Sequence, residues 1–284
     1  MRIGYYPGCS LLGSSREFDE SVRAVLGALD VELVEVPDWN CCGASSAHIL
    51  DHDLSLALPA RILAQAEAAG LDEVLAPCAA CFNRLATTRL ELAEHPDTRA
   101  RIAEILGQPY AGTVRVLNIL ELLDRLGEQV KAKVVQPFAH DLACYYGCLL
   151  VRPPKAVAFD RPEDPRSMDR LVALAGARPL DWAFKTECCG AAFSVTRTDL
   201  VGKMSAKILD DAVRRGAEAL VVACPMCHSN LDMRRPAIDA QLGASHATPV
   251  LFVTQVLGLA FGLPPERLGL QRHMVPVRFT AAHA

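Results

Sequence analysis

Short apolar stretches alternate with longer helix-like stretches along the first half of the chain. Residues 2–6, 31–36, 73–76 and 114–118 read as buried strands. Helices are predicted at residues 17–29, 53–69, 81–92 and 119–126. The first carries apolar positions at helical spacing, and the second is rich in Ala and Leu and ends at Gly70. Residues 96–112 are polar and partly helical. This alternation, with loops of a few residues, predicts a mainly parallel sheet covered by helices.

The second half repeats this order. Strands are predicted at 141–146, 218–223 and 249–253, with helices at 167–175 (capped by Ser167), 199–215, 225–242 and up to 261. Residues 130–138 are predicted to be a linker plus edge structure. The proline-containing segment 152–165 is predicted to be a long ordered loop near the site, and residues 179–184 lead to the second cysteine pair described below. The tail from residue 263 is expected to pack across a lobe or a partner. The sequence predicts an α/β fold of two pseudo-symmetric Rossmann-like lobes, with domains at 1–135 and 136–284.

The cysteines follow the same repeat. The run Cys41-Cys42-Gly-Ala returns as Cys188-Cys189-Gly-Ala, and each run has a C-x-x-C downstream and a tyrosine pair with a cysteine upstream. These features account for ten of the eleven cysteines, namely Cys9, Cys41, Cys42, Cys78, Cys81, Cys148, Cys188, Cys189, Cys224 and Cys227. Only Cys144 is left over. The five of the first half follow predicted strands, and the carboxyl ends of parallel strands share one edge of the sheet. We therefore expect the five cysteines of a lobe to converge.

Thiolates at this spacing point to a metal. Thiolates bind Zn(II) and iron–sulfur clusters, and a C-x-x-C at a helix start brings two of them to one centre, where the helix N-terminus favours the ionised form. A redox dithiol is the alternative for a single C-x-x-C. Both adjacent cysteines can face one centre only if the backbone turns sharply, which Gly43 and Gly190 permit. Five cysteines exceed the usual four ligands, so either one is spare or the centre is unusual and uses a bridging thiolate.

Composition narrows the function classes. The net charge of −4 gives no basic surface for nucleic acid. No apolar run approaches the ~18–20 residues that span a bilayer, and the N-terminus enters a strand pattern without a signal peptide, so we expect a cytoplasmic protein without a membrane span. In a reducing compartment, cysteines are ligands or catalysts more often than disulfides.

The cysteine pattern resembles a known family. Two copies of Cys…Cys-Cys-Gly…Cys-x-x-Cys, together with Tyr-Tyr-Pro-Gly-Cys9-Ser, Pro-Asp-Trp-Asn-Cys41-Cys42-Gly-Ala-Ser-Ser-Ala-His48, Tyr-Tyr-Gly-Cys148 and Arg152-Pro153, resemble the cysteine-rich CCG domains of the heterodisulfide reductase B subunit over essentially the whole chain. The resemblance implies two non-cubane [4Fe–4S] clusters, with a disulfide substrate between them that takes one electron from each. In methanogens that substrate is the coenzyme M–coenzyme B heterodisulfide. The family's partners are a ferredoxin-like C subunit of heterodisulfide reductase and a flavoprotein A subunit.

The resemblance also implies the ligands. Carried over by position, Cys9, Cys41, Cys42, Cys78 and Cys81 hold the first cluster, and Cys148, Cys188, Cys189, Cys224 and Cys227 hold the second; through the clusters these ten carry the chemistry. Cys144 is expected to be a buried structural thiol. Leu149 departs from the family motif, where a second histidine is expected. If that histidine protonates the product thiolate, this chain uses another group or a different substrate.

Residues near the cysteines have two interpretations each. His48 is either a proton donor or a helix cap, and His228 is a candidate for tuning Cys227. Arg152 and Lys155 either meet an anionic substrate group or belong to a solvated loop. Trp39 and Trp182, just before the cysteine pairs, are expected to pack over the centres. The remaining histidines, His283 among them, are expected on the surface or in loops.

Two alternatives to disulfide chemistry stay open. The chain could be an electron-relay subunit of a succinate dehydrogenase-like or glycolate oxidase-like quinone-linked complex, which related CCG domains serve. It could also be a scaffold with Zn(II) in one or both lobes, for example one [4Fe–4S] cluster plus Zn. No C-x-x-C-x-x-C run occurs in the sequence, so an ordinary cubane relay has to come from a partner.

Overall fold

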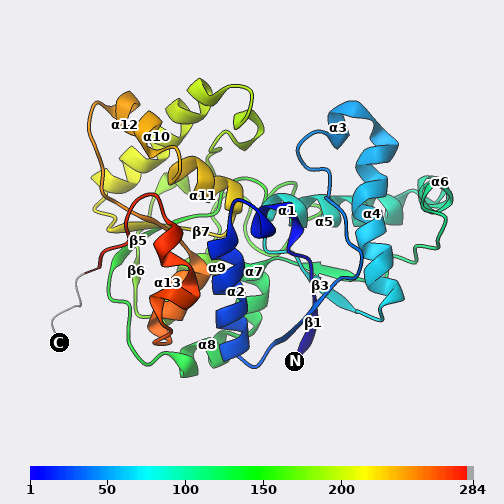
Figure 1. The fold of residues 1–284 in the computed structure, drawn as a ribbon, viewed down its shortest axis with the longest axis horizontal. Helices are drawn as coiled ribbons and strands as arrows, with labels where there is room; N and C mark the ends of the chain where they lie inside the picture. The colour runs from blue at the N-terminus through cyan, green and yellow to red at the C-terminus, as the bar shows by residue number, and fades with distance from the viewer. Residues whose placement is uncertain (280–284) are drawn as a thin grey trace.

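Two four-stranded parallel sheets form the centres of the protein, which the computed structural model describes for residues 1–279. Their strand orders are β2-β1-β3-β4 and β6-β5-β7-β8, so the two sheets have the same topology. The strands are β1 (Arg2–Tyr5), β2 (Glu32–Glu35), β3 (Glu73–Leu75), β4 (Arg115–Leu117), β5 (Asp141–Tyr145), β6 (Arg178–Pro179), β7 (Ala219–Val222) and β8 (Val250–Phe252). The predicted α/β fold of two lobes is confirmed; lobe 1 comprises β1 to α8, and lobe 2 the elements from β5 onward (Figure 1).

Helices connect successive strands in both lobes. The α-helices are α1 (Gly8–Leu12), α2 (Arg16–Ala28), α3 (Ala47–Leu50), α4 (His52–Ala68), α5 (Ala79–Glu94), α6 (Pro96–Leu106), α7 (Ile119–Arg125), α8 (Gly127–Lys133), α9 (Ser167–Leu174), α10 (Thr198–Arg214), α11 (Pro225–Leu231), α12 (Arg235–Leu242) and α13 (Val253–Ala260). The 3-10 helices are η1 (Ala183–Thr186), η2 (Ala191–Phe193), η3 (Pro265–Leu268) and η4 (Leu270–Arg272). The division at residues 135 and 136 stays a prediction, and residues 280–284, His283 included, lie outside the described part.

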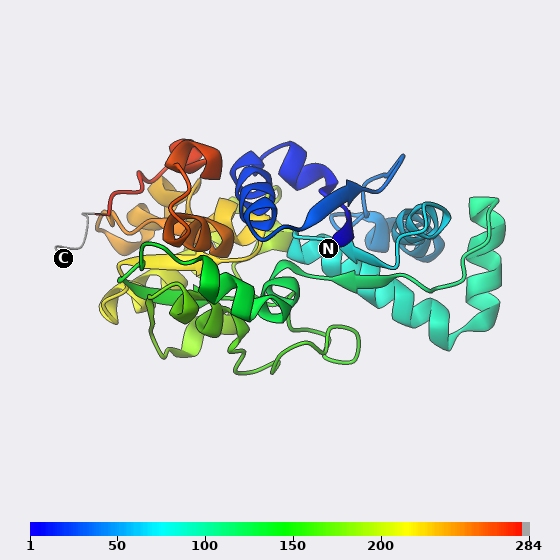
Figure 2. The same cartoon turned by 90° about the horizontal axis from the view of Figure 1, so that it is seen from below.

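The two lobes exchange helix contacts. Helices α4, α5 and α6 pack together in lobe 1, as α10, α11 and α12 do in lobe 2. The first long helix of lobe 1, α2, instead packs on α13, the last α-helix of lobe 2, and α9 of lobe 2 packs on α7 and α8 of lobe 1 (Figures 1 and 2). The terminal helices of lobe 1, α7 and α8, therefore pack on a helix of lobe 2, and the terminal helix of lobe 2, α13, packs on a helix of lobe 1.

Buried side chains carry this exchange. The Phe18 ring of α2 stacks on that of Phe252 with the ring centroids 4.0 Å apart. Beside them, the hydroxyls of Ser21 and Thr254 lie 2.7 Å apart and satisfy one another away from water. On the exposed side, Arg170 of α9 pairs with Asp124 of α7 at 2.8 Å. The apolar periodicity of α2 and α9 predicts that one face of each helix is buried. In the structure, these faces pack against the other lobe.

The tail after α13 crosses from lobe 2 to lobe 1. Its 3-10 helix η3 packs on α2, and Arg272 of η4 donates to the Glu20 carboxylate at 2.8 Å. The prediction that the tail packs across a lobe is confirmed for residues up to 279.

Three local predictions were wrong. Ser167 does not cap α9: its hydroxyl has no hydrogen-bond partner among the described residues, and the free N–H groups at this helix start are bound by Asp160 and by the Tyr146 hydroxyl. Within residues 130–138, α8 continues to Lys133 instead of forming edge structure, since β2, β4, β6 and β8 are the sheet edges. Cys9 lies in the short helix α1 rather than in a loop.

Candidate metal centres

In lobe 1, five cysteines follow three neighbouring strands. Cys9 comes after β1, Cys41 and Cys42 after β2, and Cys78 is the N-cap of α5, whose first turn contains Cys81. The Cys42 and Cys81 Sγ atoms are 3.3 Å apart although 39 residues separate them in sequence. Cys42, Cys78 and Cys81 are buried, whereas Cys9 and Cys41 are exposed. The sheet therefore assembles a sulfur site with a buried side and an open side.

Lobe 2 repeats this arrangement. Cys148 follows β5, Cys188 and Cys189 follow η1, and Cys224 is the N-cap of α11, which contains Cys227. The Cys189 and Cys227 Sγ atoms are 3.7 Å apart. The three corresponding cysteines are again buried, Cys188 is exposed, and Cys148 is half-buried. The structure thus brings together the two predicted groups of five, one in each lobe.

A glycine leaves room beside each sulfur site. A Cβ atom added at Gly8 would lie 3.0 Å from the Cys81 Sγ, and one at Gly147 would lie 2.9 Å from the Cys227 Sγ. Both glycines have positive φ values, +63° and +67°, which other residues rarely adopt. The backbone before Cys9 and Cys148 can therefore approach the sulfur atoms closely.

The glycine after each cysteine pair turns the chain, as predicted. Gly43 and Gly190 have φ values of +74° and +81°. Their N–H groups lie 3.5 Å and 3.3 Å from the Sγ atoms of Cys41 and Cys188. This turn lets the first cysteine face the solvent while the second is buried.

An aromatic pair supports each cysteine loop. The Tyr6 hydroxyl donates to the carbonyl of Asn40, just before Cys41, at 2.8 Å. The Tyr145 hydroxyl donates to the carbonyl of Glu187, just before Cys188, at 2.6 Å. The equivalent tyrosines are thus the second of one pair and the first of the other.

The two tryptophans pack on these tyrosines. Trp39 packs edge-on against Tyr6 with the ring centroids 5.5 Å apart, and Trp182 packs against Tyr145 at 6.4 Å. The immediate contact of each tryptophan is thus a tyrosine ring, and packing over the centres themselves stays a prediction.

The crowded thiols differ in acidity. Hydrogen bonds from neighbouring cysteines, Cys41 first, hold the pKa of Cys42 well below its usual range, while the hydrogen bond with Cys42 raises the pKa of Cys81. In lobe 2 the pKa of Cys189 is lowered and that of Cys227 is raised by the hydrogen bond between them. A thiol group in such a set can ionise only at its neighbours' expense, because like charges repel at close range.

These sites fit a metal–sulfur centre. All eleven cysteines, which lie within residues 1–279, are free thiols. Two sulfur ligands about 2.3 Å from one tetrahedral metal lie roughly 3.8 Å apart, close to the spacings of 3.3 Å and 3.7 Å. The donors are soft sulfurs, which select Zn(II) or iron–sulfur clusters, and a cationic centre would let several thiolates coexist.

Two side chains beside the lobe 2 site were missed in the sequence. Asn230 lies one turn after Cys227, and its amide Nδ2 is 3.5 Å from the Cys189 Sγ. Lys185 is buried and donates to the Asp169 carboxylate at 2.7 Å. A polar residue one turn after a C-x-x-C was a usable signal for Asn230, whereas nothing in the sequence pointed to a buried lysine.

Cys144 stands apart from the sulfur sites. It lies in β5, completely buried, and burial raises its thiol pKa well above the usual value. We expect Cys144→Ala to leave the metal content unchanged and to lower the free energy of unfolding by less than about 2 kcal/mol, as for a small buried truncation. Metal analysis and urea unfolding test this, and loss of metal in this variant would contradict it.

The two candidate histidines do not meet a cysteine sulfur. His48 is exposed on α3, and α4 is capped by Asp51, not by His48. His228 is buried: its Nε2 faces the Val250 carbonyl at 3.1 Å and its Nδ1 faces Glu17 at 3.6 Å. Burial lowers its pKa well below the usual value. The cap role of His48 was wrong, and both ring nitrogens of His228 are directed at groups other than cysteine.

The two candidate cations are engaged elsewhere. Arg152 pairs with Glu163 at 2.7 Å, and Lys155 pairs with Glu94 of α5 at 2.8 Å. Both side chains are exposed, so their loop is a solvated segment that contacts lobe 1, and the interpretation as a substrate-anion site receives no support.

A second ligand-type cluster lies at the lobe junction. His228, Asp232 and His273 are buried, with potential ligand atoms within 4.8 Å of one another. The Gln255 amide N–H lies 2.8 Å from the His273 Nε2, which must accept this hydrogen bond, so the proton of neutral His273 resides on Nδ1. Asp232 accepts two backbone N–H groups of the tail. The cluster is therefore a hydrogen-bonded support for the tail.

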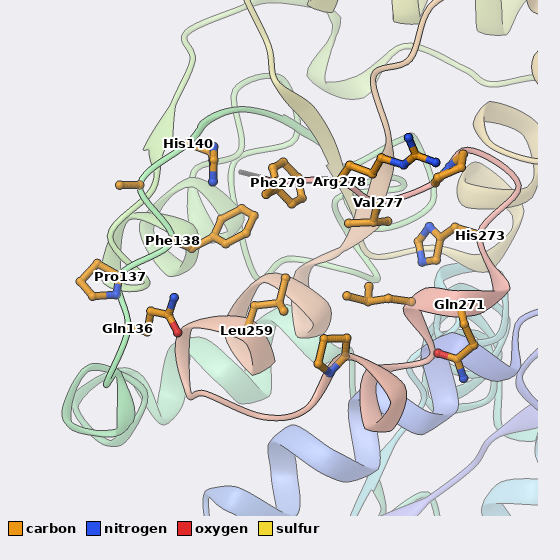
Figure 3. Close-up of a pocket in the computed structure, with 14 residues that line it drawn as sticks. Gln136, Pro137, Phe138, His140, Leu259, Gln271, His273, Val277, Arg278 and Phe279 are labelled. Atoms are coloured by element: carbon orange, nitrogen blue, oxygen red, sulfur yellow. The ribbon is translucent and has the colours of Figure 1, made fainter. Parts of the chain in front are cut away.

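A cavity of about 820 Å³ lies between residues 136–140, α13 and the tail (Figure 3). Phe138, His140 and Phe279 gather on one side of it with ring centroids 4.6–4.8 Å apart. None of its fourteen lining residues is a cysteine. The cavity is separate from both sulfur sites.

Known proteins share this fold. A crystal structure of a hypothetical protein from Helicobacter pylori superposes with a TM-score of 0.79 at 15% identity, over 98% of this chain and 53% of that one. This likeness concerns the fold alone.

Two relatives match the chain over nearly its full length. The chain is 31% identical to the 8-methylmenaquinol:fumarate reductase membrane anchor subunit of Wolinella succinogenes, over 96% of both chains. It is also 31% identical to the B subunit of a CoB-CoM heterodisulfide reductase from Methanosarcina acetivorans, over 96% of this chain and 94% of that one. Among residues 1–279, no helix has the length and apolar character needed to cross a membrane.

The family itself is matched twice. The pattern that defines the cysteine-rich domain, CCG, matches residues 3–86 and 142–232, once in each lobe. With its two CCG domains and its full-length similarity to these relatives, the chain belongs to the family of the heterodisulfide reductase B subunit.

Proposed function

We propose that this chain is the iron–sulfur subunit of a heterodisulfide reductase-like complex. In this proposal it reduces, or forms, the disulfide bond of a substrate that lies between its two sulfur sites. In this proposal each lobe holds one non-cubane [4Fe–4S] cluster with its five cysteines. When bound, the clusters would supply one electron each; the disulfide accepts two electrons and two protons and becomes two thiols.

A direct hydrogen-bonded link between the elements that carry the two sulfur sites is the observation that carries this proposal. Asn83, two residues after Cys81 in lobe 1, donates its amide hydrogens to the carbonyls of Leu149 and Arg152 at 2.9 Å and 2.6 Å. Leu149 directly follows Cys148 of lobe 2. The helix that starts at one sulfur site therefore holds the loop of the other, as expected if one substrate is to meet both.

Access to the sites also supports the proposal. Cys9, Cys41 and Cys188 are exposed, and Cys148 is half-buried, whereas the C-x-x-C pairs are buried. The buried thiols would anchor each centre, and the exposed ones leave its outer side open to a small disulfide or thiol. The proposed partners are a ferredoxin-like C subunit and a flavoprotein A subunit, because no cubane relay motif occurs in the chain.

A second function has equal similarity behind it. The membrane anchor protein of the fumarate reductase is as similar to this chain as the heterodisulfide reductase protein is. In this alternative the same centres relay electrons between a quinone and a partner and no thiol binds to them. The geometry of the lobes is compatible with both, so the test must ask whether a thiol reaches the clusters.

The test is metal analysis and electron paramagnetic resonance (EPR) of anaerobically purified protein. We expect about eight iron and eight sulfide per chain, four for each [4Fe–4S] cluster, and a paramagnetic signal of the oxidised protein that depends on added thiol. The same clusters without any response to thiol would favour the relay. Zinc, or about four iron per chain with no thiol response, would replace the proposal by a scaffold with one structural lobe.

A further inference from the structure

The two sulfur sites differ in charge one turn after the C-x-x-C. Asn230 occupies this position in lobe 2, three residues after Cys227, and Arg84 occupies it in lobe 1, three residues after Cys81. One site thus has a neutral amide where the other has a guanidinium. The rest of the surroundings repeat closely, including the glycine cradle and the tyrosine support.

The Asn230 amide is fixed toward its sulfur. It is completely buried, and its Oδ1 accepts from the Ser194 hydroxyl at 3.0 Å and from the Arg234 Nε at 3.3 Å. Its Nδ2 therefore points to Cys189, where it lies 3.2 Å from the carbonyl oxygen and 3.5 Å from the Sγ. Lobe 2 offers its site a neutral hydrogen-bond donor.

The Arg84 guanidinium has a donor to spare. Its Nη2 donates to the Ser55 carbonyl at 2.6 Å, while its Nε is buried without a hydrogen-bond partner among the described residues. A buried N–H without an acceptor is costly, and a cluster sulfur would supply one. Residues three apart on a helix lie on the same face, so Arg84 on α5 is a neighbour of Cys81 at the lobe 1 site.

A second difference precedes the cysteine pairs. Neutral Asn40 stands before Cys41, whereas Glu187 stands before Cys188. The Glu187 carbonyl accepts the Tyr145 hydroxyl at 2.6 Å, which holds this acidic residue directly before Cys188. Both differences make the surroundings of the lobe 1 site more positive than those of the lobe 2 site. Lobe 1 has Arg84 where lobe 2 has a neutral residue, and lobe 2 has Glu187 where lobe 1 has a neutral residue.

Nearby cations do not cancel this difference. Arg61 approaches Asn40 at 3.1 Å but is paired with the Asp38 carboxylate. In lobe 2, the Lys185 ammonium is paired with Asp169 at 2.7 Å. The Arg152 guanidinium, which reaches the Thr186 carbonyl at 3.5 Å, is paired with Glu163. Arg234 stands behind Asn230 and binds its Oδ1 and the Ser194 carbonyl. The amide of Asn230 therefore separates this guanidinium from Cys189.

We propose that the two centres are electrochemically unequal and that Arg84 and Glu187 make the centre of lobe 1 the stronger electron acceptor. A nearby cation stabilises the reduced centre, which carries one more negative charge, and a nearby anion destabilises it. The proposal rests on the proposed function, because it requires a redox centre in each lobe. Its consequence is an order of events: the first electron comes to rest in lobe 1, and the lobe 2 centre is the stronger reductant toward substrate.

Redox titration of the loaded protein, followed by EPR and absorbance, tests this. The wild-type chain should show two midpoints. Arg84→Gln should lower the higher midpoint potential by at least about 59 mV, which for a one-electron couple is a tenfold change in the oxidised-to-reduced ratio at a given potential. Arg84→Lys should largely restore it. Glu187→Gln should shift the lower midpoint up, by less than the Arg84 effect, because Glu187 is exposed and its charge is screened.

Matched controls separate this tuning from general damage. Arg89→Gln removes an exposed arginine of the same helix α5 and should move neither midpoint. Iron content should stay at the wild-type level in all these variants. A single midpoint in the wild-type chain, or an Arg84→Gln shift no larger than that of Arg89→Gln, would overturn the inference and leave the proposed function standing. A wild-type chain without iron would overturn both.

Discussion

Cys42→Ala is expected to reduce the iron content to about half of the wild-type value, from about eight to about four per chain, and Cys189→Ala to do the same for the other lobe. Both thiols are buried and lie 3.3 Å and 3.7 Å from a second cysteine sulfur, so each variant removes a ligand from one site only. The lobes have separate sheets, and the intact lobe should therefore keep its centre.

The matched control is Cys144→Ala, another buried cysteine replaced in the same way but outside both sites. Iron and sulfide analysis after anaerobic purification gives the measurement. Wild-type iron in both Cys42→Ala and Cys189→Ala would show that four ligands suffice and that the five-cysteine centre is wrong. Complete loss of iron in either single variant would instead show that the two centres depend on one another.

Asp169→Ala is expected to lower the free energy of unfolding by about 3–5 kcal/mol, the range for breaking a buried ion pair. The change leaves the Lys185 ammonium, whose side chain is 3% exposed, without its closest carboxylate. It also removes the acceptor of the Tyr146 hydroxyl at 2.6 Å. Because the Lys185 carbonyl accepts the N–H groups of Tyr146 and Gly147, just before Cys148, the variant should also loosen the lobe 2 site.

Denaturant unfolding measures this effect, with Asp199→Ala as the control. Asp199 pairs with Arg197 at 2.9 Å on the surface, where water and salt screen the pair and its loss should change stability little. Equal midpoints for Asp169→Ala and Asp199→Ala would contradict a stabilising role of the buried pair. Lower iron in lobe 2 alone, with lobe 1 retained, would tie the pair to the Cys148 loop.

Much of the fold follows from local patterns. The strands that precede Cys9, Cys78, Cys148 and Cys224 were predicted within a few residues, because apolar runs between helical segments define them. The convergence of the cysteines followed from one rule, that parallel strands end at one edge. The misplaced cap at Ser167 has a different origin: Tyr146 and Asp160 come to that helix start only through the tertiary fold.

Periodicity identifies a buried helix face but not what covers it. The apolar face of α2 was evident from Phe18 and its neighbours, yet the partner is Phe252, far away in the sequence. The unequal surroundings of the two sites were hidden for a similar reason. The spacing after each C-x-x-C singles out positions 84 and 230, but only the fold shows the Asn230 amide 3.5 Å from the Cys189 Sγ and the Arg84 Nε buried without a partner among the described residues.

The reciprocal exchange of α2 and α9 has a consequence for the origin of this architecture. A single lobe standing alone would leave the Phe18 face of α2 without Phe252, and its own terminal helices without α9. An ancestor of one lobe would therefore have had to pair with a second copy of itself, each giving its first long helix to the other across a two-fold axis. Duplication of such an ancestor would join the two copies into one chain and leave positions such as 84 and 230 free to diverge.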